Sequence, residues 1–281
     1  MRAIFTACLA VLTTIGSSAC GPNPPVGVGG AGGVGGSGGG GGSSTRPPCS
    51  TAASQTVIIG DSYISWGSHS LPADLTREAG ETWRLYAVGG ASMASGGITG
   101  FIPDQFEAAL RANPRINTVV MDGGGNDVLI CDALRFPGCN DCKNSANSAN
   151  LPVCRNIVQA AIDRARVVMN RAADVGVKDV VYFFYPRVPE GTLVGGARPN
   201  AILEYALPLA RELCNSAAQT TGGRLRCHFV DLIPVFQGHP EYFAGGDIHP
   251  NNLGSAAMAR AIWAQMRTSC VSQKSASGCC G

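Results

Sequence analysis

One serine and one histidine in this sequence stand where they could support nucleophilic catalysis. Ser62 closes the triplet Gly-Asp-Ser at residues 60–62, directly after a short apolar run. A serine at a strand-to-helix turn exposes its hydroxyl, and neighbouring backbone N–H groups point at whatever binds there. His249 lies in the segment Gly246–Asn251, which also contains Asp247. Histidine is the usual general base for a serine hydroxyl because its pKa lies near neutrality.

Two glycine-rich segments could complete such a site. Gly90 follows a second apolar run, where glycine lets the main chain approach a ligand closely. Asn126 follows a third run, and its side-chain amide could stabilise an oxyanion. Taken alone, each motif has an ordinary structural interpretation: the Gly-Asp-Ser triplet and Gly90 as turns, and Asn126 as a helix N-cap.

The other three histidines serve as internal comparisons. His69 lies shortly after Ser62, His228 lies within an apolar run, and His239 precedes a proline in a polar segment. We expect all three to be structural or solvated. Only His249 combines a nearby acid with a loop that leads into a final helix.

The elements that must position these residues alternate along the chain. Short β-branched runs predict five strands, and the longer stretches between them predict helices. The expected strands are Thr56–Ile59, Trp83–Val88, Thr118–Met121, Val180–Phe184 and Cys227–Val230, and the expected helices are Leu71–Ala79, Pro103–Ala112, Val153–Ala173, Asn200–Ala218 and Asn252–Met266. This alternation indicates a parallel sheet covered on both faces, in which ligands bind at the carboxyl ends of the strands.

Together the motifs resemble the four blocks of the SGNH (GDSL-like) hydrolases, and the similarity covers roughly residues 55–268. The resemblance implies a three-layer α/β/α sandwich, flavodoxin-like, with a five-stranded parallel sheet and no metal or organic cofactor. It also implies roles: Ser62 as nucleophile of an acyl-enzyme, and His249 as general base. An oxyanion hole would combine the N–H groups of Ser62 and Gly90 with the side chain of Asn126.

The acidic member of the site departs from the family pattern. The family's usual acid lies three residues before the histidine, and that position is Gly246 here, whereas Asp247 lies only two residues before. Either Asp247 reaches the imidazole after a one-residue shift, or a main-chain carbonyl orients His249 in a dyad. A third interpretation makes Asp247 a solvated or helix-capping acid.

The resulting hypothesis is an exported serine esterase of carboxylic esters, including deacetylation of a carbohydrate; a lipase or thioesterase would use the same mechanism. The alternative is a non-catalytic surface lipoprotein that uses the hydrolase fold to bind glycan or protein. A disulfide-rich domain with accidental motifs is disfavoured by the order of the blocks. In either of the first two cases, Phe183–Arg187 would border the cleft, with the phenylalanines in the core.

Charge and length restrict the class of partner. The 281 residues carry 21 basic and 19 acidic side chains, a formal net charge of +2, with no basic stripe. This balance does not argue for nucleic acid or an anionic membrane surface and leaves a small or neutral substrate. With the family resemblance, the expected partner is a small or carbohydrate-borne ester. We expect a monomer with one folded domain, residues 49–281.

The N-terminus predicts export. Residues 1–20 contain Arg2, an apolar run and small residues before Cys20, as in a bacterial signal peptide with lipid attachment at Cys20; cleavage after Ala19 and free secretion is the alternative. Residues 21–48, rich in glycine, predict a disordered linker. The protein would therefore be a cell-envelope lipoprotein or extracellular, and a membrane would be contacted only through the lipid.

Cysteine usage agrees with export. Of 12 cysteines, ten remain once Cys8 and Cys20 are set aside, and an even number suits disulfides. The insertion at residues 131–154 holds four, for which two disulfides are favoured over a zinc site. Cys214 should pair with Cys227. The remaining four, Cys49, Cys270, Cys279 and Cys280, would join the two ends of the domain.

Overall fold

Five parallel strands form the centre of the fold, in the order β2-β1-β3-β4-β5. The computed structural model describes residues 53–67, 70–130, 132–191 and 198–273. The strands are β1 (Thr56–Ile59), β2 (Arg84–Leu85), β3 (Thr118–Met121), β4 (Asp179–Phe183) and β5 (Arg226–Val230). All residues of β1, β3 and β4 are buried, as expected of strands covered on both faces.

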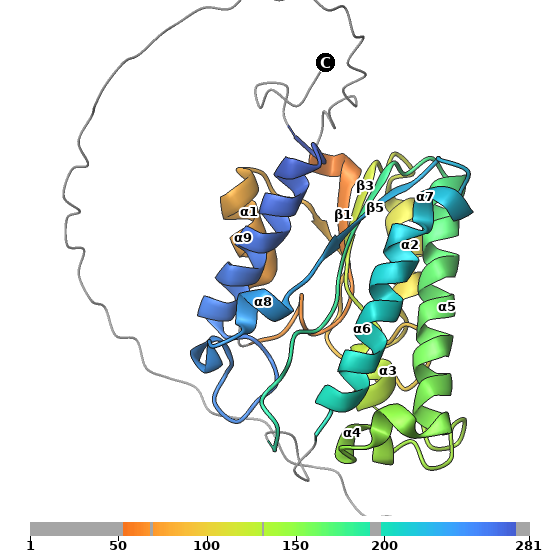
Figure 1. The fold of residues 1–281 in the computed structure, drawn as a ribbon. Coiled ribbons are helices and arrows are strands. Elements are labelled where there is room, and N and C mark those ends of the chain that lie inside the picture. Colours follow the sequence, from red (N-terminus) through yellow and green to blue (C-terminus); the bar gives the residue numbers. More distant parts are fainter. Residues whose placement is uncertain (1–52, 68–69, 131, 192–197, 274–281) are drawn as a thin grey trace, which may run out of the picture. The chain divides into compact units, whose positions relative to one another are not determined.

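Helices cover both faces of the sheet (Figure 1). The α-helices are α1 (Leu71–Ala79), α2 (Ile102–Ala112), α3 (Gly125–Leu129), α4 (Asp141–Asn144), α5 (Pro152–Asp174), α6 (Asn200–Asn215), α7 (Ala217–Thr220), α8 (Ile233–Phe236) and α9 (Asn252–Thr268). Helices α1 and α9 lie side by side on one face, and α2, α5 and α6 lie on the other (Figure 1). The predicted α/β/α sandwich with a five-stranded parallel sheet is confirmed, including its flavodoxin-like strand order.

Local sequence signals explain where the helices that flank the site begin and end. Helix α1 has a proline in its first turn and ends at Gly80, whose left-handed backbone (φ 69°) lets its N–H bond the Thr76 carbonyl. Helix α9 begins after Asn251, whose side chain accepts hydrogen bonds from the N–H groups of Leu253 and Gly254. Ser255 of α9 donates to Asp74 of α1 over 2.5 Å, which ties the two helices together.

Two predicted elements are shorter in the structure. Strand β2 keeps only Arg84–Leu85 of the expected run. The N–H groups of Tyr86 and Val88 still donate to Ile58 and Gly60, but the Gly60 N–H donates to the Gln105 side chain and not to β2, which is an edge strand with one neighbour. Helix α6 ends at Asn215, and α7 follows separately. The hydroxyl of Ser216 donates to the Glu212 carbonyl and competes with the helical ladder at this break.

Disulfides fasten two surface connections. Cys142 bonds Cys154 and thereby joins α4 to α5, and Cys214 bonds Cys227 and joins α6 to β5. Cys139 and Cys270 are also disulfide-bonded. The expected pair Cys214–Cys227 is confirmed, and the disulfide interpretation of the C-x-x-C segment holds for both of its cysteines.

The chain's last described residues cover the amino-terminal ends of the central strands. Ser272 is buried, and its hydroxyl lies 2.9 Å from the hydroxyl of Thr56 in β1 and 2.9 Å from that of Thr118 in β3. Val271 and Gln273 beside it are buried as well. This segment therefore closes the end of the sheet opposite the predicted site.

The predictions for the signal peptide, for Cys20 and for the linker at residues 21–48 fall outside the described residues and stay predictions. Within the described ranges, no helix is both long and apolar enough to cross a membrane.

Candidate active site

Ser62 follows the carboxyl end of β1, in a turn that Gln105 of α2 fixes by hydrogen bonds. The residue is only 4 % exposed. Gln105 of α2 clamps Gly60 from both sides: its amide oxygen accepts from the Gly60 N–H over 2.7 Å, and its amide nitrogen donates to the Gly60 carbonyl over 2.8 Å. Gly60 has φ 148°, and a Cβ there would lie 1.7 Å from Oδ1 of Asp122. Only glycine lets the chain enter the nucleophile turn this way.

Two carboxyl groups, those of Asp61 and Asp122, contact the turn that contains Ser62. Oδ1 of Asp122 accepts the Asp61 N–H over 2.8 Å, and the carboxylate of Asp61 accepts the Tyr63 N–H and the hydroxyl of Tyr185. Burial raises the pKa of Asp61, and burial together with the charge of Asp61 raises the pKa of Asp122 well above its ordinary value. Adjacent buried carboxyls cannot both ionise easily, which is why the pKa of Asp122 rises so far.

His249 and Asp247 form a hydrogen-bonded pair on the loop before α9. Oδ1 of Asp247 lies 2.8 Å from Nδ1 of His249 and also accepts the N–H of Ile248 over 2.7 Å. Partial burial opposes ionisation of Asp247, but the charge of His249 and these hydrogen bonds leave its pKa below the ordinary value. The acid is therefore ionised at neutral pH and holds a proton on Nδ1, which leaves Nε2 free to accept one.

The loop closes on itself so that residue 247, rather than 246, reaches the ring. The Ala244 N–H donates to the His249 carbonyl over 2.9 Å, and the Asp247 N–H donates to the Ala244 carbonyl over 3.0 Å. An isolated antiparallel bridge between Phe243 and Pro250 closes the loop further. The one-residue shift of the acid is thus accommodated by a tight turn, and the structure brings Asp247 and His249 together.

The nucleophile turn and the histidine loop are joined directly. The hydroxyl of Tyr63, next to Ser62, donates to the Ile248 carbonyl over 2.9 Å. His249 is 8 % exposed. In the described part of the chain, no hydrogen bond joins the Ser62 hydroxyl to the His249 ring. Such bonds are often long in free enzymes and tighten when substrate binds.

Gly90 lies on a loop and Asn126 in the first turn of α3, and the structure connects the two segments. Gly90 has φ 81°, and its carbonyl accepts the Ile98 N–H over 3.0 Å. One N–H of the Asn126 amide donates to the Ala91 carbonyl over 2.8 Å. The amide is thereby oriented by the Gly90 loop and keeps a second N–H for another acceptor.

Asp127 fixes the rest of this loop. Its carboxylate accepts the N–H groups of Met93, Ala94 and Ser95 over 2.7, 2.6 and 2.7 Å. Burial raises the pKa of Asp127 to about 6 despite these hydrogen bonds. A single side chain next to Asn126 therefore anchors the segment that follows Gly90.

Two residues of the site, Trp66 and Asp122, were not predicted from the sequence, whereas Tyr185 belongs to a segment expected to border the cleft. Trp66 stacks on the His249 ring, with ring centroids 4.2 Å apart. Asp122 and Tyr185 contact Asp61 from the carboxyl ends of β3 and β4. The position of Asp122 directly after β3 is the signal that could have identified it. The segment Phe183–Arg187 was expected to border the cleft with its phenylalanines in the core; Phe183 and Phe184 are buried, while Tyr185 reaches inward to Asp61.

The comparison histidines lie elsewhere. His228 of β5 lies 2.9 Å from Asp179 of β4, and His239 lies 2.8 Å from Glu241 on the surface. His69 falls outside the described residues. Across residues 53–273, apart from the short gaps, no three His, Cys, Asp or Glu side chains are placed to hold a metal ion.

Comparison with known sequence families identifies the chain. Residues 58–257 match the GDSL-like Lipase/Acylhydrolase family. The chain belongs to this SGNH hydrolase family. The match includes the nucleophile turn, the Gly90 and Asn126 loops and the His249 loop, and the family comprises ester hydrolases such as esterases and lipases.

Solved structures share the fold of this family member. A carbohydrate acetylesterase family member from Sinorhizobium meliloti is 16 % identical, with TM-score 0.50 over 77 % of this chain and 99 % of its own. A candidate arylesterase from Agrobacterium tumefaciens is 20 % identical, with TM-score 0.50 over 76 % and 99 %. No curated protein matches the chain. At these identities the likeness concerns the fold alone.

Proposed function

We propose that this GDSL-family member is an exported serine esterase that hydrolyses carboxylic esters through an acyl-enzyme. Ser62 is the nucleophile, His249 the general base and Asp247 the acid that orients it. The single observation that carries the proposal is the 2.8 Å contact between Asp247 and Nδ1 of His249, on a loop joined to the Ser62 turn by Tyr63.

The arrangement supports a two-step reaction. Nε2 of His249 takes the Ser62 proton as Oγ bonds the carbonyl carbon, and it then passes that proton to the alcohol oxygen as the ester C–O bond breaks. Water next attacks the acyl-enzyme with His249 again as base, and the acid leaves as the bond to Oγ breaks. Asp247 stabilises the imidazolium in both steps.

The oxyanion of each tetrahedral intermediate would be bound by the N–H groups of Ser62 and Gly90 and by the free N–H of Asn126. Hydrogen bonds to Ala91 and from the 93–95 backbone to Asp127 hold these donors before substrate arrives. Donors that are already in place before substrate binds lower the activation barrier most, by about 3 to 4 kcal/mol each.

Substrate class and location are proposed on separate grounds. Fold neighbours include proteins named for carbohydrate acetylesterase and arylesterase activity, which supports a small acyl group, including acetyl groups on carbohydrate. The disulfides Cys142–Cys154 and Cys214–Cys227 support an oxidising compartment outside the cytoplasm. Export would use residues 1–20 as signal peptide, with Cys20 as the lipidated residue.

The test is Ser62-dependent turnover. The protein, produced in an oxidising compartment, is assayed with p-nitrophenyl acetate and butyrate and labelled with a fluorophosphonate. Ser148→Ala is the matched control, because Ser148 is also a buried serine and its hydroxyl has no hydrogen-bond partner. We expect turnover and labelling in the wild type and in Ser148→Ala, and neither in Ser62→Ala. Equal rates with and without Ser62 would favour the non-catalytic binding protein.

A further inference from the structure

Trp66 is an exposed aromatic residue that covers the catalytic histidine. Its indole stacks on the His249 ring with centroids 4.2 Å apart and an interplanar angle of 13°. The residue is 43 % exposed. A tryptophan that contacts the base and remains open to solvent is available to touch a substrate as well.

The same indole also touches the loop of the oxyanion donor. A Cβ built on Gly89 would lie 3.3 Å from Cε3 of Trp66 and 2.7 Å from the Ser65 carbonyl oxygen. Gly89 precedes Gly90, so Trp66 lies between His249, the proposed general base, and Gly90, a proposed oxyanion donor. Trp66 therefore stacks on His249 and lies beside the Gly89–Gly90 segment.

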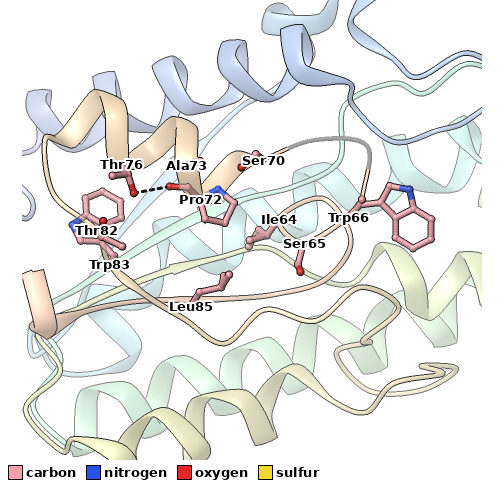
Figure 2. A pocket seen from close by; sticks show the side chains of 11 residues that line it. Ile64, Ser65, Trp66, Ser70, Pro72, Ala73, Thr76, Thr82, Trp83 and Leu85 are labelled. Atoms are coloured by element: carbon pink, nitrogen blue, oxygen red, sulfur yellow. Dashed lines mark hydrogen bonds between the residues drawn. The ribbon is translucent and has the colours of Figure 1, made fainter. Parts of the chain in front are cut away.

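A cavity of about 740 Å³ starts at Trp66 and extends between α1 and the β2 edge of the sheet. Figure 2 shows Trp66 at one end, with Trp83 and Thr82 at the other. Pro72, Ala73 and Leu85 supply apolar wall, and Ser70, Thr76 and Thr82 supply hydroxyls. No charged side chain lines it among the described residues. Its volume is that of a small-molecule site.

The chemistry of the proposed reaction decides which part of an ester faces this cavity. The histidine that takes the serine proton also protonates the leaving oxygen, so the alcohol part lies on the histidine side of the carbonyl carbon. The oxyanion donors occupy another side. Because Trp66 both stacks on His249 and is one of the residues that line the cavity, the alcohol part is directed there.

We propose that Trp66 and the α1–β2 cavity form the subsite for the alcohol part of the ester, and that this part is a neutral alcohol with an apolar ring face. The ring face packs on Trp66, and the cavity's hydroxyls bond the polar groups of the alcohol. A charged head group is disfavoured because nothing charged lines the wall. An aryl alcohol and a sugar share this chemistry. The inference rests on the esterase proposal and names its substrate side.

The test fills the cavity without touching the catalytic residues. Ala73 is exposed on α1 and lines the cavity, so Ala73→Phe narrows it at little cost to folding. Glu78→Phe is the matched control, since Glu78 is exposed on the same helix and is not a lining residue. The substrates are methyl acetate, phenyl acetate and an acetylated methyl xyloside, which share the acyl group, together with methyl hexanoate.

We expect Ala73→Phe to lower kcat/KM at least about tenfold for phenyl acetate, the xyloside or both, mainly through KM. Methyl acetate and methyl hexanoate should change less than about twofold. Whichever ring ester responds identifies an aryl or a sugar alcohol. Trp66→Ala should lower kcat/KM for the ring esters more than for methyl acetate. Trp66→Phe should restore most of the lost kcat/KM for the ring esters.

The inference would be overturned if Ala73→Phe lowered all acetates equally, if only methyl hexanoate responded, or if Glu78→Phe had the same effect. Binding separates this inference from the esterase proposal. Two of the three tryptophans, Trp66 and Trp83, line the cavity, so phenol and methyl xyloside should change the intrinsic fluorescence of the wild type and not of Ala73→Phe. A protein that hydrolyses esters but shows no such change would refute the subsite alone.

Discussion

The carboxylate of Asp247 makes a quantitative prediction about catalysis. In Asp247→Asn the side chain keeps its shape, and its amide oxygen can still accept the N–H of Ile248. What is lost is the negative charge beside Nδ1 of His249, 2.8 Å from Oδ1. Because the imidazolium forms only as the proton moves, this loss falls on the transition state and lowers kcat.

The magnitude follows from distance and exposure. Unit charges about 4 Å apart interact by about 4 kcal/mol at an effective dielectric constant of about 20. The Asp247 side chain is 30 % exposed, so solvent screening reduces this value, to about 2 kcal/mol if it is halved. At about 1.4 kcal/mol per factor of ten, kcat should fall between about 30-fold and 1000-fold, with KM little changed.

The assay is steady-state hydrolysis of p-nitrophenyl acetate by wild type, Asp247→Asn and Glu241→Gln. The last variant is a matched control, because Glu241 makes an equivalent 2.8 Å contact with Nδ1 of His239 outside the site. It removes the same charge from a neighbouring segment of the chain and should leave kcat within about twofold.

A fall of less than about fivefold in Asp247→Asn would refute the reasoning, since a main-chain carbonyl would then suffice to orient His249. An equal fall in Glu241→Gln would refute it differently, because the effect would then reflect the general field of the protein.

Two further predictions concern the oxyanion loop and the buried carboxyls. Asn126→Ala should lower kcat about 100- to 1000-fold with nearly unchanged KM, and a larger effect on KM would exclude an oxyanion role. Stability should decrease as pH rises. The raised pKa values of Asp61, Asp122 and Asp127 make the folded state bind more protons than the unfolded state. Their contribution to the free energy of unfolding is therefore complete at a pH below the pKa of the unfolded state, and it is lost as the pH rises through the pKa of the folded state. For Asp127, from 3.8 to about 6, this is at most about 3 kcal/mol. Urea unfolding at pH 4.5 and 7 measures it; Asp127→Asn should flatten the profile, and stability that rises with pH in the wild type would contradict it.

Much of the fold was predictable because its strands are buried on both faces. Strand β1 and helix α1 have the residue bounds expected from the sequence. Continuous β-branched runs followed by glycine leave little alternative to a parallel strand. The length of edge strand β2 was overestimated, because an apolar run does not reveal that the strand has only one neighbouring strand to pair with.

The site was predictable where chemistry depends on residue type, and not where it depends on packing. Ser62, Asn126 and His249 follow from motifs, but the distance from Asp247 to the ring is set by the closure of the 243–250 loop. Trp66 could not be assigned to His249 because nothing in either local sequence specifies a stack between positions so far apart.

The burial of Ser272 against Thr56 and Thr118 matters for anyone who trims this protein. The family match ends at residue 257, so homology alone suggests a boundary that removes residues 258–273. Such a cut would expose the first residues of β1 and β3 and delete most of α9. Ser62, the proposed nucleophile, follows the carboxyl end of β1, so we expect a shortened chain to lose the geometry of the proposed site through damage at the amino-terminal end of the same strand. Fluorophosphonate labelling of truncated forms should therefore disappear while Ser62, Asp247 and His249 are all still present.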